Sequence, residues 1–271
     1  FTYSLLFSET KEIWEGKTIV WNMVRQTVQG IMQKNDYEKN DKKLSLIISM
    51  LAEEGNMLSM EELIGEISQF FIAAFDTTGH ALTHIFTLLG MNPKEQEKVY
   101  EEVKQTVGLD DPIRYDDLPN LKYTERAILE AMRLLPSVPL IVRRAQADID
   151  LGTKKLPAGA SVIISIFHLH RSEAYWKNPL EYNPDRFLPE EIEKRHPNTF
   201  IPFSFGPRDC IGKRYAMIAM KVAVAHVIRK YKVVSKYKSV EEMHFVSAIT
   251  MKTSHEIDCR FIAREANETI F

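Results

Sequence analysis

The residues with the clearest chemical potential lie between Phe203 and Gly212, in the stretch Phe-Ser-Phe-Gly-Pro-Arg-Asp-Cys-Ile-Gly. Cys210 directly precedes a helix that we expect to begin near Ile211. The unpaired N–H groups and the positive dipole end of a helix N-terminus favour a thiolate over a thiol, and Arg208 adds a cation nearby. Because a thiolate is a strong metal ligand, the stretch predicts a metal-ligating sulfur at Cys210.

The other residues of this loop suit a flat ligand. Gly206 and Gly212 lack a Cβ, so a planar group could lie close to the backbone, and Phe203 could shield the sulfur. An isolated cysteine is more often a buried, inert residue. Here, however, the pattern Phe-x-x-Gly-x-Arg-x-Cys-x-Gly fixes five of ten positions, which favours the metal-ligand interpretation.

This pattern resembles the heme-binding loop of the cytochrome P450 family, the heme-thiolate monooxygenases. In that family the cysteine is the proximal iron ligand, and its electron donation favours O–O cleavage. The resemblance implies heme b as the cofactor and Cys210 as its iron ligand. The cofactor-binding residues that it implies are Cys210, Arg208, Phe203, Gly206 and Gly212.

A second motif, Glu130-Ala-Met-Arg133, places a carboxylate and a guanidinium on one face of a predicted helix. Alone it fits an ordinary solvated pair. It is followed by Leu-Leu-Pro and, further on, by Asn-Pro-Asp-Arg186-Phe. By resemblance, Glu130, Arg133 and Arg186 form a buried structural triad that locks the loop before the cysteine.

Asp76 and Thr77 lie in the middle of a helix that is otherwise apolar on this face. The hydroxyl could simply bond back to a carbonyl one turn earlier, and the acid could face water. The resemblance implies instead an oxygen-activation segment in which Asp76 and Thr77 are catalytic and relay protons. Ala74 stands where the family usually has glycine.

Position-for-position carry-over predicts a mostly apolar substrate pocket, which suits a lipophilic small molecule. Its residues are Ala73, Phe75, Val138, Leu140, Ile249 and Thr250. The loop looks most like that of the microsomal family-four clan, whose fatty-acid hydroxylases often carry a heme-esterifying glutamate at the position of Ala73. We therefore expect non-covalent heme.

Two further groups of residues have competing interpretations. His168 and His170 alternate as on a strand, but a metal pair without a third ligand is not favoured. A basic set on the predicted last helix fits a solvated surface or the docking of an acidic, flavin-bearing reductase equally well. The members of this set are Lys213, Arg214, Lys221 and Arg229. The implied partner is an NADPH-cytochrome P450 reductase.

The elements that position these residues follow from periodicity. Proline-free segments with apolar residues at spacings of three and four predict helices over Trp14–Lys34, Lys42–Glu54 and Met60–Leu89. Start and stop signals from proline and glycine delimit two more, over Lys94–Val107 and Leu118–Leu135. Ser59 and Glu62 predict a capping box. β-type runs at Ile149–Leu151 and Ser161–Phe167 predict a hairpin.

Residues 172–209 form a long Pro-, Asn- and Asp-rich loop that we expect to be functional. A helix over Ile211–Tyr231 and a small sheet around Phe245–Met251 follow. The predicted fold is mainly α with small β-sheets, a cytochrome P450-like C-terminal portion. We expect one partial domain over 1–271: helical to 135, mixed over 136–232, and a small β region over 240–262.

Composition narrows the function classes. With 35 basic and 37 acidic side chains, the net charge of −2 argues against nucleic acid as a partner. Two cysteines, Cys210 and Cys259, cannot build a disulfide framework. Apolar runs fall short of the roughly 20 residues of a membrane span, and the chain begins without Met. We expect part of a longer protein, anchored by a missing N-terminal segment to the cytoplasmic face of the endoplasmic reticulum membrane.

The leading hypothesis is a monooxygenase that uses O₂, a lipophilic substrate and electrons from an NADPH-dependent reductase. A heme-thiolate hydroperoxide isomerase is an alternative, but that chemistry needs no proton relay such as Asp76 and Thr77. A truncated, non-catalytic fragment is the third hypothesis, because the fragment alone could be inactive.

Overall fold

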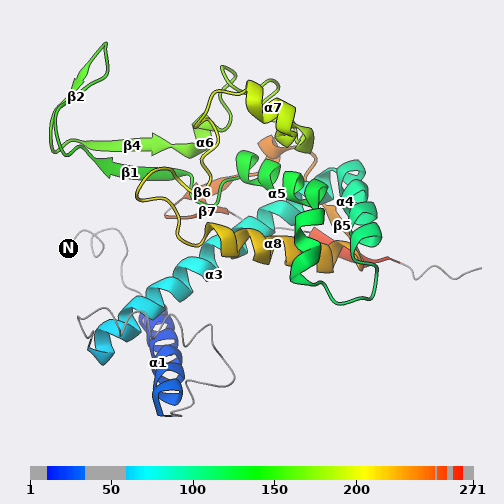
Figure 1. Ribbon diagram of the computed structural model, residues 1–271, viewed down its shortest axis with the longest axis horizontal. Helices are drawn as coiled ribbons and strands as arrows, with labels where there is room; N and C mark the ends of the chain where they lie inside the picture. The colour runs from blue at the N-terminus through cyan, green and yellow to red at the C-terminus, as the bar shows by residue number, and fades with distance from the viewer. Residues whose placement is uncertain (1–10, 34–58, 248, 255–258, 265–271) are drawn as a thin grey trace, which may run out of the picture. The chain divides into compact units, whose positions relative to one another are not determined.

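The computed structural model describes residues 11–33, 59–247, 249–254 and 259–264 (Figure 1). The chain divides into two compact units, Phe1–Phe75 and Asp76–Phe271. The boundary between them falls within one long helix, α3 (Met60–Met91). The helix predicted over Lys42–Glu54 lies outside the described residues.

The first unit contains α1 (Lys11–Gln33) and the beginning of α3. Both helices agree with the periodicity of the sequence, and their apolar stripes meet in a small core. Its buried residues are Val24, Val28, Leu63 and Ile64. The predicted capping box is confirmed: the N–H of Ser59 donates to Glu62 Oε2 at 2.8 Å, and the N–H of Glu62 donates to Ser59 Oγ at 3.3 Å. The main-chain N–H and the hydroxyl of Ser59, which both donate to the carboxylate, lower the pKa of Glu62.

The second unit contains the remaining elements. Its longer helices are α4 (Pro93–Thr106), α5 (Lys122–Leu134) and α8 (Lys213–Ile228). Its short helical turns are η1 (Tyr115–Asn120), α6 (Ile166–Leu169), η2 (Pro184–Phe187), α7 (Pro189–Lys194) and η3 (Val240–Glu242). Its strands are β1 (Leu140–Arg144), β2 (Ile149–Asp150), β3 (Lys155–Leu156), β4 (Ser161–Ser165), β5 (Tyr231–Ser235), β6 (Phe245–Ser247), β7 (Met251–Thr253) and β8 (Cys259–Ala263).

The core of this unit lies where α4, α5 and α8 pack together, with β5 beside them (Figure 1). Apolar side chains at helical spacing fill it, among them Leu88, Val103, Ile128, Leu134 and Val224. The buried side chain of Gln96 on α4 completes the edge of β5. Its amide donates to the carbonyl of Val233 and accepts from the N–H of the same residue, both at 2.9 Å.

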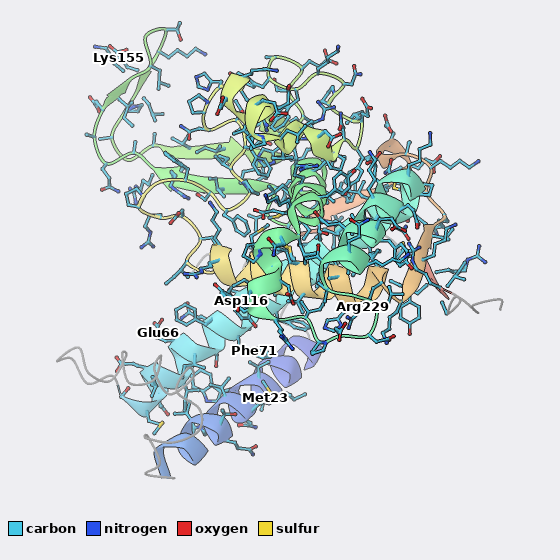
Figure 2. All side chains as sticks on the ribbon, turned by 45° about the vertical axis from the view of Figure 1, so that its right-hand side comes forward. Met23, Glu66, Phe71, Asp116, Lys155 and Arg229 are labelled. Atoms are coloured by element: carbon cyan, nitrogen blue, oxygen red, sulfur yellow. The ribbon has the colours of Figure 1, made fainter. Side chains whose placement is uncertain are left out.

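The strands pair as β1 with β4, β2 with β3, β5 with β8 and β6 with β7, all antiparallel. The predicted hairpin is therefore wrong in its pairing, because Ile149 faces Leu156 rather than the later run. Gly152 adopts a φ of +80°, and its N–H is held by Asp150 Oδ1 at 2.8 Å, so the chain turns at once. Figure 2 shows Lys155 near the tip of this projecting hairpin.

The start of α5 and the end of α8 also differ from expectation. Helix α5 begins at Lys122 instead of Leu118, which lies in η1 with Pro119. A proline lacks the N–H donor and disfavours helical backbone at the residue before it. Helix α8 ends at Ile228 because the chain passes into β5 at Tyr231. In the described ranges, no helix combines the length and the apolar character that crossing a bilayer requires.

Candidate functional site

Cys210 lies in a turn just ahead of α8. Its N–H donates to the carbonyl of Phe203 at 2.9 Å, and its own carbonyl accepts the N–H of Lys213 at 3.4 Å. The helix begins two residues later than the predicted Ile211, because Gly212 is its N-cap. The cysteine therefore stands beside the first turn of the helix, held at both main-chain groups.

The loop around the sulfur is exposed and carries both apolar and charged side chains. Cys210 is exposed, and Phe205 and Ile211 on either side are 66% and 84% exposed. Gly206 has a φ of +90°, a conformation that disfavours any residue with a Cβ. A Cβ added at Gly212 would lie 3.8 Å from Sγ of the cysteine. An accessible cysteine sulfur, with two exposed apolar side chains and two glycines in the same loop, fits heme.

The other loop residues carried over from the family occupy different environments. Phe203 is partly buried and packs against the main core, so its predicted role as a shield for the sulfur stays a prediction. Arg208 is exposed, next to the proline of the loop. Neither position contradicts a cofactor-binding role, and neither tests it.

Arg143 on β1 is a residue that sequence reasoning missed. Its Nη2 donates to Ser204 Oγ at 2.7 Å and to the carbonyl of Arg208 at 3.4 Å. Ser204 itself has a φ of +66°. The arginine therefore ties β1 to the cysteine loop. The only signal in the sequence is a pair of arginines ending an apolar, strand-like run.

The three residues of the predicted triad do meet. Arg133 Nε lies 2.7 Å from Glu130 Oε2 and its Nη2 lies 2.8 Å from Oε1, which makes the pair bidentate. Arg186 Nε lies 3.3 Å from Glu130 Oε1. The side chains of Glu130 and Arg133 are fully buried. Whether this ion-pair network supports a cofactor stays a prediction.

The ion-pair network also fastens the long loop predicted over residues 172–209. Arg133 donates to the carbonyls of His170, Pro179 and Glu181 at 2.8, 2.7 and 3.1 Å. Glu130 Oε1 accepts the N–H of Asn183 at 2.9 Å. A buried ion pair is tolerated when such additional hydrogen bonds satisfy its remaining donors and acceptors.

The two histidines of the same region are not on a strand, as the alternation suggested. His168 belongs to α6, and its Nδ1 lies 2.7 Å from Ser165 Oγ. His170 follows α6 and is fully buried, with Nε2 accepting the N–H of Ile201 at 2.9 Å. Burial, with the nearby charge of Arg133, lowers the pKa of His170 to about 3. Within the described part of the chain, no three metal-ligating side chains cluster.

Asp76 and Thr77 lie on α3, half-buried, at the start of the second unit. Thr250 Oγ1 donates to Asp76 Oδ2 at 2.8 Å. His80 Nδ1 lies 2.8 Å from the carbonyl of Asp76 and 3.5 Å from its Oδ1. Thr250, predicted to line a pocket, therefore holds the proposed relay carboxylate. The relay itself stays a prediction.

The predicted pocket residues divide between the two units. The carbonyl of Ser137 accepts the N–H of Met251 at 2.8 Å, which brings the segment of Val138 beside that of Ile249. Leu140 and Ile249 are exposed. Ala73 and Phe75, also exposed, lie on α3 within the first unit. The pocket role of all six residues stays a prediction.

The predicted basic face is smaller than its sequence suggested. Lys221 is buried and pairs with Glu125, Nζ to Oε2 at 2.5 Å. Arg229, labelled in Figure 2, is buried, and its Nη1 donates to the carbonyl of Asp111 at 2.6 Å. Both side chains stabilise the fold. Lys213 and Arg214 are the two members of the set that remain exposed.

The sequence of this chain is similar to those of known proteins. Cytochrome P450 4V2 of Mus musculus is 37% identical over 222 residues, which cover 81% of this chain and 42% of that protein. Cytochrome P450 4c3 of Drosophila melanogaster is 40% identical over 192 residues, which cover 70% of this chain and 36% of that protein. The chain thus spans less than half the length of these relatives.

A solved structure shares the fold. The crystal structure of the cytochrome P450DA heme domain matches with a TM-score of 0.80 at 25% identity, covering 94% of this chain and 56% of that one. The predicted fold class, mainly α with small sheets, is confirmed. The family model for Cytochrome P450 matches residues 1–257. With an exposed thiol beside the first turn of α8 and the ion-pair network assembled, the chain belongs to the cytochrome P450 family.

Proposed function

We propose that this chain carries the thiolate side of a heme monooxygenase that inserts one oxygen atom of O₂ into a lipophilic small molecule. The observation that supports it is the presentation of Cys210, exposed in a loop whose main chain is fixed by Phe203 and Lys213. Bound at this cysteine, heme b would supply the activation of dioxygen.

The residues of the loop would have distinct tasks toward the cofactor. Cys210 would ligate the iron as a thiolate. Gly206 and Gly212 would allow a ring to approach the backbone, Arg208 would add positive charge, and Phe203 would limit access of water to the sulfur. The cofactor would be held non-covalently, because Ala73 has no carboxylate that could esterify it.

Proton delivery would fall to the α3 residues. The Asp76 carboxylate is partly exposed and accepts a hydrogen bond from Thr250, so it is oriented while remaining open to exchange protons with solvent. The hydroxyl of Thr77, next along the helix, would pass the proton inward. This relay favours monooxygenation over isomerisation of a hydroperoxide, which takes up no protons.

The proposed substrate class follows from the apolar side chains of the predicted pocket. Val138, Leu140 and Ile249 carry no polar group, and the hydroxyl of Thr250 is already engaged by Asp76. Such a lining binds by burying apolar surface and discriminates by shape. We therefore propose a lipophilic substrate.

Electrons would come from an NADPH-cytochrome P450 reductase. Exposed Lys213 and Arg214 at the start of α8 could attract an acidic partner, and Arg214 Nη2 is oriented by the hydroxyl of Tyr115 at 2.8 Å. By resemblance to the family, we propose the cytoplasmic face of the endoplasmic reticulum membrane as the location.

The test is the carbon monoxide difference spectrum of the reduced, heme-loaded protein, because thiolate ligation displaces the Soret band. We expect the thiolate-type band in the wild type and in Cys259→Ala, and its loss in Cys210→Ala. Cys259 is a matched control because it is the other free cysteine and its Sγ points to Thr87 Oγ1 at 3.6 Å. Bound heme without the band in the wild type would overturn the proposal.

A further inference from the structure

His170 is a buried titratable residue to which the proposed function gives no task. It follows α6, and its Nε2 accepts the N–H of Ile201 at 2.9 Å. Because Nε2 accepts, we assign the ring proton to Nδ1. Nδ1 lies near the carbonyls of Met132 and Arg133 without a well-aligned hydrogen bond.

The main chain of His170 is fixed at both polar groups. Its carbonyl accepts Arg133 Nη1 at 2.8 Å, and its N–H donates to the carbonyl of Ile166 at 2.9 Å. Through Arg133, the residue is joined to the ion-pair network that also holds Glu130. The imidazole therefore projects from a backbone that is held by a buried guanidinium and by α6.

On the far side of the imidazole, the hydrogen bonds continue to the cysteine. Ile201, whose N–H is held by His170, accepts the N–H of Ser204 through its carbonyl at 3.0 Å. That turn contains Phe203, whose carbonyl accepts the N–H of Cys210 at 2.9 Å. His170 thus lies in the hydrogen-bonded route from the ion-pair network to the cysteine.

Aromatic packing restricts the orientation of the imidazole. The ring of His170 lies 5.0 Å from the ring of Phe200, which in turn lies 4.7 Å from Phe187 and 6.3 Å from Trp176. Because interior side chains are close-packed, rotating the imidazole would displace this cluster. Nε2 is therefore held in a direction that suits Ile201.

We propose that His170 is a positioning residue that fixes the segment before Cys210, with its imidazole on the N–H of Ile201 and its carbonyl on Arg133. The proposal rests on the proposed heme-thiolate function, because its consequence is the geometry of the thiolate ligand. A low pKa suits this role, because a doubly protonated imidazole would have no lone pair for the N–H of Ile201. Burial keeps the pKa of His170 at about 3.

The experiment compares His170→Phe with His170→Gln in heme-loaded protein. Phenylalanine keeps a ring against Phe200 but offers no acceptor, whereas glutamine places an acceptor near the position of Nε2. We expect the thiolate-type band of the ferrous carbon monoxide complex to be lost about tenfold faster in His170→Phe, which corresponds to about 1.4 kcal/mol. His170→Gln should restore the wild-type rate to within about twofold.

His84→Phe is the matched control. His84 is another buried histidine of the second unit, its Nδ1 bonded to the carbonyl of Leu135 at 3.0 Å and its ring against Phe245. This control separates general destabilisation from an effect on the cysteine loop. Equal acceleration in His84→Phe and His170→Phe, or no rescue by His170→Gln, would overturn the proposal.

A wild-type measurement covers the case in which His170→Phe does not fold. Amide hydrogen exchange at Ile201 should be slowed at least about tenfold relative to an unprotected loop amide, since its N–H is bonded to a buried nitrogen. Fast exchange at Ile201 would overturn the positioning role. If the wild type itself lacks the thiolate-type band, the proposed function is wrong. If the wild-type band is normal and the His170 variants lose it at the wild-type rate, only the positioning role of His170 is wrong.

Discussion

The cysteine loop and the ion-pair network of Glu130, Arg133 and Arg186 belong to the same unit but differ in exposure and in the groups that hold them. Cys210 is exposed, as are Phe205 and Ile211 in the same loop, while the side chains of Glu130 and Arg133 are fully buried. The loop is held chiefly through its main chain, whereas the network binds distant segments by charged side chains. His170 joins the two regions, and Arg143 ties the cysteine loop to β1 instead.

This difference teaches where stability and reactivity are located. A ligand-binding sulfur must be reachable, so it contributes little to the packed interior. The buried charges stabilise the surrounding loop only because each is paired and hydrogen-bonded. Substitutions in the ion-pair network should therefore change the free energy of unfolding. Substitutions in the cysteine loop should change the chemistry. The predictions below test that separation, from the largest expected effect to the smallest.

Glu130→Leu should give the largest loss of stability. It leaves the guanidinium of Arg133 buried without its carboxylate, and breaking a buried pair costs about 3–5 kcal/mol. Urea unfolding followed by circular dichroism measures this loss. The matched control is Glu191→Gln, which breaks an exposed pair of the same spacing with Lys194, and we expect no measurable change. Equal effects of the two substitutions would contradict the contrast.

Lowering the pH should destabilise the buried region. Burial lowers the pKa of His84 to about 4, and the charges of His80 and Arg171 add to the effect. Between pH 6.5 and about 4, the unfolded chain therefore binds a proton at His84 that the folded chain does not. The free energy of unfolding should fall with decreasing pH by up to about 1.4 kcal/mol per unit for this histidine. Urea unfolding over this range should show a shallower slope in His84→Phe, and an unchanged slope would refute the assignment.

Gly206→Ala tests how far the loop depends on backbone conformation alone. Among the described residues, no atom lies within 4 Å of a Cβ built at Gly206, so the cost comes from the positive φ and should be about 1–2 kcal/mol. The control is Gly79→Ala, also free of close contacts but helical, where we expect a gain of about 0.5–1 kcal/mol. Thermal unfolding of both variants measures the difference. A neutral Gly206→Ala would show that the loop adjusts without strain.

Thr250→Val should alter chemistry more than stability. It removes the hydroxyl that orients Asp76, and losing one such hydrogen bond costs about 0.5–1.5 kcal/mol. We expect the ratio of peroxide to product per NADPH consumed to rise by up to about tenfold, with Thr250→Ser close to wild type. An unchanged ratio in Thr250→Val would remove this hydroxyl from the relay.

Cys210→Ala should have the smallest effect on stability, despite abolishing the thiolate-type spectrum. Substituting an exposed side chain such as Cys210 changes the free energy of unfolding by at most about 0.5 kcal/mol. Cys259→Ala should cost more, about 1 kcal/mol, because this side chain is partly buried against the core. Calorimetry of both apoproteins tests the ranking. A larger loss of unfolding free energy for Cys210→Ala than for Cys259→Ala would mean that the Cys210 side chain also stabilises the fold.

The local parts of the site could be predicted from the sequence because they depend on spacing within one element. The cysteine pattern and the pairing of Glu130 with Arg133, three residues apart on a helix, are of this kind. Contacts across the fold could not be read from periodicity. Thr250 lies 174 positions from Asp76, and Ile201 lies 31 from His170.

Burial of charge was the other limit of sequence reasoning. Lys221 looks like a surface residue in the sequence, yet the turn η1 offers the carbonyl of Leu118 to its ammonium at 2.9 Å. Such a partner is visible only when the chain has been folded. Strand pairing could not be predicted either, because the turn at Gly152 pairs β2 with β3, whereas the apolar pattern favoured the later run.

The pair of hydrogen bonds between the Gln96 side chain and the main chain of Val233 on β5 has a consequence for biosynthesis. Its partner Val233 is 137 residues further along the chain. At roughly 5–20 residues per second, a ribosome completes that interval in about 7–27 s. During this time α4 is already made, but the amide of Gln96 lacks its buried partner on β5, so this part of the core cannot close until β5 emerges.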